Sequence, residues 1–251
     1  MQDSSAAATK WGAVGTWDVS GVGDFSHAFS TWRNVGGSFA AHGNPKAATF
    51  VGTGISSWKT TSATLMNYMF RSAGAMNADL GGWSVAKVTT LSWTFIGASE
   101  FVGTGLAKWN TAKVEYLSNT FSEASKFAGT GIGSWDTAAV ISLSSTFNKA
   151  GEMNADLSGW RVGEVTTMSA TFDRASKFVG TGLGSWDTAK VTTMSQTFYL
   201  ASKFAGTGLG SWDTASVTTL ASTFNRAGMN VDVSGWDVAK VANMGAVFMY
   251  V

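Results

Sequence analysis

The chain has 251 residues and a formal net charge of +1; only 13% of its residues are charged, 12 are Trp and none is Cys. Without clustered Lys and Arg it is not expected to bind nucleic acid, and without Cys it forms neither disulfides nor thiolate metal sites. No apolar run approaches 18 residues, and the first ten residues hold no apolar signal-peptide core, so we expect no membrane span and any secretion signal to be absent or already removed.

In chain order, residues 1–16 are expected to form an N-terminal cap, and Trp17 begins a series of regularly spaced tryptophans. The first interval is 41 residues, because the first coil carries an insertion within 30–46 that holds His42 and the only proline, Pro45. The later intervals are 24–26 residues, and the members after Trp17 are Trp58, Trp83, Trp109, Trp135, Trp160, Trp186, Trp212 and Trp236. The sequence therefore predicts one solenoid domain over 1–251, with nine coils of about 26 residues filling 17–251.

Each coil is predicted to contain a strand, a short helix and a glycine turn. An aliphatic residue stands three positions before each tryptophan and Val or Thr two positions after it, which is the spacing of the strand in a leucine-rich repeat. In the Trp186 coil the next apolar residues, Val191, Met194, Phe198 and Ala201, are 3, 4 and 3 apart, as on one helix face. Residues suited to capping that helix are Asp24, Thr90, Ser142, Thr167, Thr193, Thr219 and Asn243.

A strand over 193–198 is the rival interpretation. A strand would bury Gln196. The same position in other coils carries side chains as different as those of Trp93 and Ala170, and a buried column would not vary so widely. The predicted fold class is therefore an α/β solenoid, a leucine-rich-repeat-like right-handed coil of about nine ~26-residue strand–short helix–turn units, curved because helices need more room than strands.

The turns follow a longer period. Gly-Thr-Gly turns are replaced in every third coil by Met-Asn-Ala-Asp or Met-Asn-Val-Asp, beginning at Met76, Met153 and Met229. The residue two after the tryptophan changes in step, being Thr after Gly-Thr-Gly and Val after Met-Asn. We expect that threonine, for example Thr188, to contact the Gly-Thr-Gly turn of its own coil.

The repeat resembles that of the BspA-type leucine-rich-repeat surface proteins, W-D-T-S-x-V-T-x-M-S-x-M-F-x-x-A. Here residues 160–175 read W-R-V-G-E-V-T-T-M-S-A-T-F-D-R-A, and residues 153–159 read M-N-A-D-L-S-G. The chain departs from the family in carrying Thr where a second Met is usual. The resemblance implies a secreted or surface-displayed, non-enzymatic protein used in adhesion or interaction, and it supplies no catalytic residues.

No motif for catalysis, cofactors or metals appears, and His27 and His42 are expected to be ordinary surface residues. We therefore expect a non-catalytic protein, extracellular or on a cell surface, that binds a protein or glycan and uses no cofactor. The candidate binding row follows each tryptophan: Asp18, Lys59, Ser84, Asn110, Asp136, Arg161, Asp187, Asp213 and Asp237. An equally open interpretation is that this row is a solvated face, whose aspartates pair with Lys87, Lys113, Lys190 and Lys240. Calcium binding on this row is disfavoured, because one carboxylate per coil supplies too few oxygen ligands.

Ice binding is the alternative function, because regular Thr and Ser columns on a solenoid can match a lattice. The columns are Thr94, Thr120, Thr146, Thr171, Thr197 and Thr223, and Ser92, Ser118, Ser144, Ser169 and Ser195. Close packing between neighbouring helices also explains small side chains there without any role for ice, and it is the preferred interpretation. The final coil shows no polar cap, so its apolar end is also expected to support end-to-end self-association.

Overall fold

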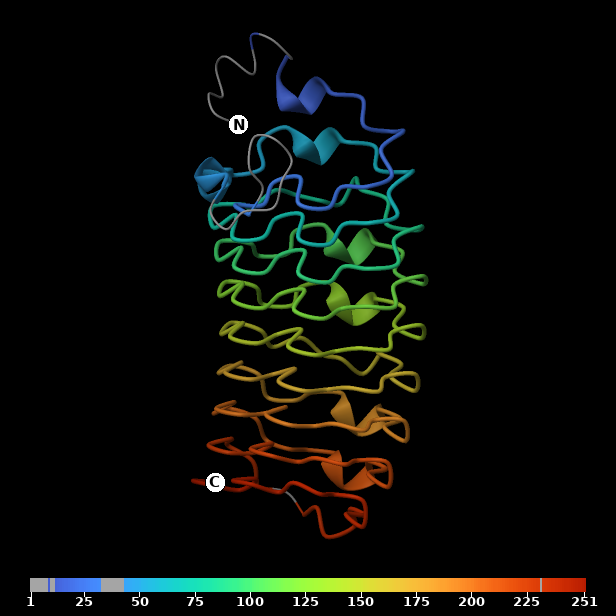
Figure 1. Ribbon diagram of the computed structural model, residues 1–251, viewed down its shortest axis with the longest axis vertical. Coiled ribbons are helices and arrows are strands. Elements are labelled where there is room, and N and C mark those ends of the chain that lie inside the picture. The colour runs from blue at the N-terminus through green and yellow to red at the C-terminus, as the bar shows by residue number, and fades with distance from the viewer. Residues whose placement is uncertain (1–8, 10–11, 33–42, 231) are drawn as a thin grey trace.

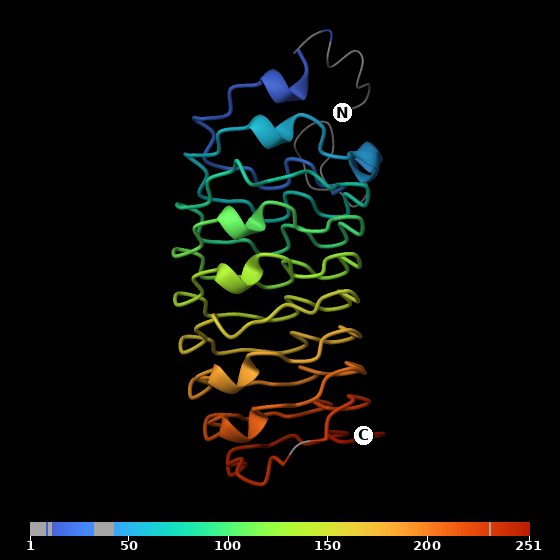
Figure 2. The ribbon, with the colours of Figure 1, turned by 180° about the vertical axis from the view of Figure 1, so that it is seen from behind.

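The computed structural model describes residues 9, 12–32, 43–230 and 232–251. In Figures 1 and 2 the chain winds into flattened coils that stack along one long axis, with the first described coil (blue) at one end and the last (red) at the other. Most of the expected N-terminal cap (1–16) and of the 30–46 insertion, with His42, lies outside the described residues.

Short 3-10 helices are the only helical elements of three or more residues in the described part of the chain. Their bounds are η1 Val14–Thr16, η2 Pro45–Thr49, η3 Ile55–Ser57, η4 Leu106–Lys108, η5 Ile132–Ser134, η6 Leu183–Ser185 and η7 Leu209–Ser211. Strands are replaced by isolated parallel bridges that run from coil to coil through Asp24, Leu65, Thr90, Tyr116, Ser142, Thr167, Thr193, Thr219 and Asn243. The predicted α/β solenoid of strand–short helix–turn units is therefore wrong.

A chain of turns stands where the helix was predicted. The N–H groups of Thr197, Tyr199 and Ala201 donate to carbonyls three residues back, whereas those of Met194, Gln196, Phe198 and Leu200 donate to the next coil at 2.9–3.1 Å. Gln196 and Leu200 adopt φ values of 58° and 56°, which a right-handed helix does not allow. Each coil thus gives half of its hydrogen bonds in this segment to its neighbour, so neither a helix nor a regular strand forms.

Six of the seven residues expected to cap that helix form local turns instead. The Oδ1 atoms of Asp24 and Asn243 accept the N–H two residues on at 2.7 and 2.9 Å, and Thr90 accepts in the same way at 3.2 Å. Asn, Asp, Ser and Thr favour helix caps and such turns for the same reason, since their short side chains reach a nearby backbone N–H. Sequence alone does not separate the two outcomes.

From Trp58 onward, the predicted strand before each tryptophan is a turn of one of two kinds. After Gly-Thr-Gly the chain forms a 3-10 helix, as at η6, and Gly182 has φ 90°. A Cβ at Gly182 would overlap the backbone of Ser158 in the preceding coil, so only glycine fits there. In the Met-Asn coils an aspartate side chain closes the turn, as where Asp156 Oδ1 accepts the N–H of Ser158 at 2.9 Å.

Aromatic columns fill the centre of the stack, as the tryptophan spacing predicts. Eight of the nine regularly spaced tryptophans are at most 9% exposed, whereas Trp17 is 39% exposed. Each of these eight indole Nε1 atoms donates to the carbonyl of the aliphatic residue in the preceding coil at 2.8–3.2 Å. Beside them, a Phe column from Phe29 to Phe248 stacks at 5.5–5.9 Å between ring centroids.

The stack shows no strong bend in either view (Figures 1 and 2). Curvature was predicted because helices would need more space than strands. Backbone hydrogen bonds link neighbouring coils on several sides of the stack, which limits any difference in coil spacing between those sides.

Candidate binding surfaces

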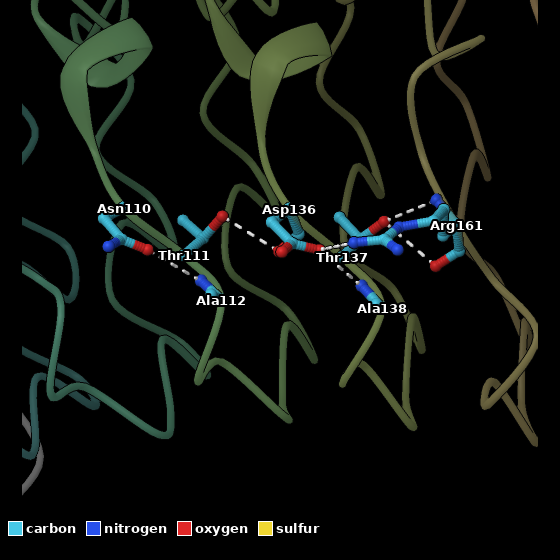
Figure 3. Close-up of polar contacts among 7 residues, drawn as sticks. All are labelled: Asn110, Thr111, Ala112, Asp136, Thr137, Ala138 and Arg161. Atoms are coloured by element: carbon cyan, nitrogen blue, oxygen red, sulfur yellow. Dashed lines mark hydrogen bonds and ion pairs between the residues drawn. The ribbon is translucent and has the colours of Figure 1, made fainter.

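The residues that follow the tryptophans, which we call the Trp+1 row, lie on the surface and are exposed except for the half-buried Ser84 and Asp136. Six of them use one side-chain oxygen to accept the backbone N–H two residues on, at 2.9–3.2 Å; they are Asp18, Asn110, Asp136, Asp187, Asp213 and Asp237. Figure 3 shows this turn at Asn110 and Asp136. The recurrent Asp is therefore explained in part by local turn formation.

Charge pairing on the row differs from the expected Asp–Lys pairing. Arg161 donates to Asp136 Oδ1 at 2.6 Å across the coil boundary (Figure 3), and Lys190 pairs with Glu164 instead of an aspartate of the row. The N–H of Ala138 and the Arg161 side chain hold the pKa of Asp136 below its usual range. Asp187, Asp213 and Asp237 consequently form an acidic end of the row, without ion pairs in the described part of the chain.

The threonine that stands two residues after five of the nine tryptophans bridges neighbouring coils. Thr188 Oγ1 donates to the carbonyl of Asp213 at 2.9 Å, and Thr137 Oγ1 both donates to the carbonyl of Arg161 at 3.0 Å and accepts its N–H at 2.8 Å. Thr188 was expected to contact the Gly-Thr-Gly turn of its own coil, but its hydroxyl bonds to the next coil.

The threonine column proposed for ice is buried. Its six members are at most 1% exposed, and the single hydroxyl proton of each is shared between a carbonyl of its own coil, 2.6–2.8 Å from Oγ1, and one of the preceding coil, 2.9–3.0 Å from Oγ1. Side chains without exposed surface cannot contact a lattice, so this column holds coils together.

The serine column lies nearer the surface. Ser92 is 4% exposed and the others are half-buried. Four of them form hydroxyl pairs with the next coil at 2.8–3.0 Å, namely Ser118–Ser142, Ser144–Thr167, Ser169–Thr193 and Ser195–Thr219. Their hydroxyl groups are thus already engaged between coils.

A short aromatic stack lies on the surface beside the serine column. His27 and Tyr68 stack at 4.6 Å, and Tyr68 and Trp93 at 4.8 Å, between ring centroids. An open depression adjoins it, lined by Asn67, Thr89, Thr90, Ser92, Trp93, Tyr116 and Ser118. Sequence reasoning missed this site, although its signal was visible: these are the only aromatic members of a column that otherwise carries Asn, Ser, Ala or Gln.

The C-terminal end of the described chain exposes Met244, Phe248 and Tyr250 by 48%, 53% and 71%. Among the described residues no three acidic, His or Cys side chains gather as a metal site would require. The same part of the chain has no helix with the length and apolarity needed to cross a bilayer.

Stacked coils with a repeated core and outward polar columns define a repeat protein. A family model described as "Mycoplasma protein of unknown function, DUF285" matches residues 1–105, 90–181 and 174–251, so the chain belongs to this family. No curated protein and no solved structure matches the chain.

Proposed function

We propose that this protein is a non-catalytic binding protein of a cell surface or extracellular matrix, and that it holds a protein or glycan partner on outward-facing side chains. One observation supports the proposal most: repeated polar side chains are engaged between coils, while varied side chains face outward. The indole and threonine groups described above bond to neighbouring coils, whereas the Trp+1 row carries Lys, Ser, Asn, Arg and Asp. A partner can therefore be selected without altering the scaffold.

Location and partner class rest on the resemblance to surface adhesion proteins and on the breadth of the exposed columns. The acidic end of the Trp+1 row, Asp187, Asp213 and Asp237, repeats at about 4.8 Å and favours a basic partner there.

Retention on coated surfaces tests the binding function. The labelled full chain is passed over neutral polysaccharides, acidic polysaccharides, a basic protein and an acidic protein. We expect saturable retention on at least one coat, lost after thermal unfolding, with no soluble fragment released from the coat. Absence of retention on every coat, or steady release of fragments, would contradict the proposal.

A triple variant tests the Trp+1 row itself. Asp187→Asn, Asp213→Asn and Asp237→Asn together remove three charges but keep the turns, because Asn110 already forms the same turn. We expect an unchanged melting temperature and several-fold weaker retention on the basic protein. Asp79→Asn, Asp156→Asn and Asp232→Asn form the matched control, since these aspartates close similar turns outside the row. Equal retention by the two triples would assign binding elsewhere.

A further inference from the structure

The column ten residues after each tryptophan, the Trp+10 column, changes character along the stack. Its members are His27, Tyr68, Trp93, Asn119, Ser145, Ala170, Gln196, Ser222 and Ala246, all with φ between 54° and 59°. The backbone is thus the same in every coil, and the three aromatic side chains are a local departure from it. Because nothing in the repeated backbone requires rings here, their presence calls for a local cause.

The aromatic stack ends at the depression. The interplanar angle between Tyr68 and Trp93 is 7°, and the next member of the column is Asn119, so no further ring continues the stack. Tyr116, which is 40% exposed, lines the same depression from the following coil. Two aromatic side chains from successive coils therefore border one small open space.

The depression is polar but uncharged. None of its seven lining residues carries a carboxylate, ammonium or guanidinium group, while Asn67, Trp93 and Tyr116 supply amide, indole N–H and hydroxyl groups. No hydrogen bond within the described residues occupies the Trp93 Nε1, Asn67 Nδ2 or Tyr116 hydroxyl group. The site thus offers neutral donors beside aromatic surface, and it has no charge with which to hold an ion.

The backbone around the depression is already paired. The N–H of Tyr68 donates to the carbonyl of Ser92 at 3.2 Å, and the N–H of Trp93 donates to the carbonyl of Ser118 at 2.9 Å. An extended peptide therefore finds no free strand edge among these groups. These bonds also hold Trp93 and its neighbours in place before any ligand arrives, which lowers the entropy lost on binding.

From these features we propose that the depression binds a neutral pyranose unit of a polysaccharide; this inference rests on the proposed binding function. A pyranose presents a face of C–H groups, which packs on the electron-rich face of an aromatic ring, and hydroxyls around its edge. Trp93 and Tyr116 contact the C–H surface, and the Asn67 amide, the Trp93 Nε1 and the Tyr116 hydroxyl hydrogen-bond the sugar hydroxyls. A few polar groups beside apolar surface are the usual composition of a small-ligand site.

The test uses residues that the same columns carry elsewhere. Trp93→Asn copies Asn119, and Tyr116→Thr copies Thr90, which occupies the same position in the preceding coil. Gln196→Ser is the control, because Gln196 belongs to the Trp+10 column but lies outside the depression. Affinity electrophoresis through gels containing β-glucan, xylan or galactomannan measures binding, and unfolding midpoints confirm that each variant is folded.

We expect at least one neutral polysaccharide to retard the parent and the control equally, and Trp93→Asn and Tyr116→Thr each to weaken binding at least tenfold with unchanged folding. Failure of all three polysaccharides to retard the parent, or equal retardation of parent and variants, would overturn the site. A further gel contains a sulfated polysaccharide. If only this gel retards the parent, and added salt removes the retardation, the proposed neutral site is also wrong. If the parent and Trp93→Asn are retained equally on the coated surfaces described above, the pyranose site is wrong but the general binding function stands. If neither is retained on any coat, both the site and the binding function are wrong.

Discussion

Individual polar side chains link adjacent coils through buried hydrogen bonds. The clearest examples are the threonines two residues after tryptophan, which are 1–2% exposed and reach the backbone of the next coil. Their bonds are not equivalent: Thr188 only donates, whereas Thr137 also accepts the N–H of Arg161. The difference predicts unequal costs for the same substitution.

Thr137→Val should therefore destabilise the protein more than Thr188→Val. Both substitutions keep the side-chain shape, and Val occurs naturally at positions 85, 162 and 238. We expect the free energy of unfolding to fall by about 1 kcal/mol for Thr188→Val and by about 1–3 kcal/mol for Thr137→Val, which leaves the partly buried N–H of Arg161 without its acceptor. Chemical unfolding measures both, and equal costs would contradict the assigned bonds.

Asp173 has a buried carboxyl group, and its polar contacts only partly offset the cost of burying its charge. Asn148 Nδ2 donates to its Oδ2 at 2.7 Å, but its Oδ1 lacks a hydrogen bond and lies 3.9 Å from Arg174 Nε. Burial raises the pKa of Asp173, and the nearby Arg174, Asn148 and Lys149 oppose this rise. A pKa that is higher in the folded than in the unfolded state makes the folded protein lose stability as pH rises through these two values.

Asp173→Asn should therefore stabilise the protein at neutral pH. Asn already occupies this position in other coils, as Asn148 and Asn225. We expect the advantage of the variant to shrink as pH falls and to vanish once the carboxyl group is protonated in both states. Thermal unfolding from pH 3 to pH 7 measures this, and a constant difference across that range would contradict the assignment.

The two turn types before the tryptophans form the same corner of the coil in different ways. Gly-Thr-Gly permits a left-handed glycine against the preceding backbone, whereas the Met-Asn form uses an aspartate side chain to close the corner. Both bring the aliphatic residue into the core, as at Leu183 and Leu157, which have no exposed surface. Their alternation thus affects the corner more than the core.

Gly182→Ala should destabilise this corner strongly. Its φ of 90° disfavours a side chain by about 1–2 kcal/mol, and the added Cβ would overlap Ser158 as well. Together these two effects should lower the free energy of unfolding by more than about 2 kcal/mol. Gly21→Ala is the control, because nothing lies within 4 Å of a Cβ there. Similar stability of the two variants would contradict this account.

Coils interact chiefly with their immediate neighbours, as the bridge series through Thr167, Thr193 and Thr219 shows. In such an array stability is close to a sum of coil and interface contributions, so whole coils can be removed where partial coils cannot. The same arrangement places ion pairs across coil boundaries, including Lys126–Glu100 at 2.6 Å and Lys177–Glu152 at 2.5 Å. These pairs are exposed and are expected to contribute little stability at each site.

Deleting residues 187–212 should leave a folded, shorter stack. The deletion removes 26 residues and joins Trp186 to Asp213, which restores the Trp-Asp-Thr-Ala sequence. We expect cooperative unfolding. The slope of the free energy of unfolding against denaturant concentration should fall by about one ninth, in proportion to the surface lost. Deleting only 187–199 breaks the register and should abolish cooperative unfolding. Cooperative folding of both, or of neither, would contradict the modular account.

The amino-acid sequence by itself determined the period, the central tryptophans and the alternation of turns, because each recurs at a fixed spacing. It also predicted the outward Trp+1 row. The tertiary structure alone decided that Thr193 begins turns instead of a helix, that Thr197 is buried, and that Trp93 borders a depression. The physical reason is that the deciding hydrogen bonds join residues about 25 positions apart: an N–H able to bond three residues back can also bond the next coil, and only the stacked coils select between them.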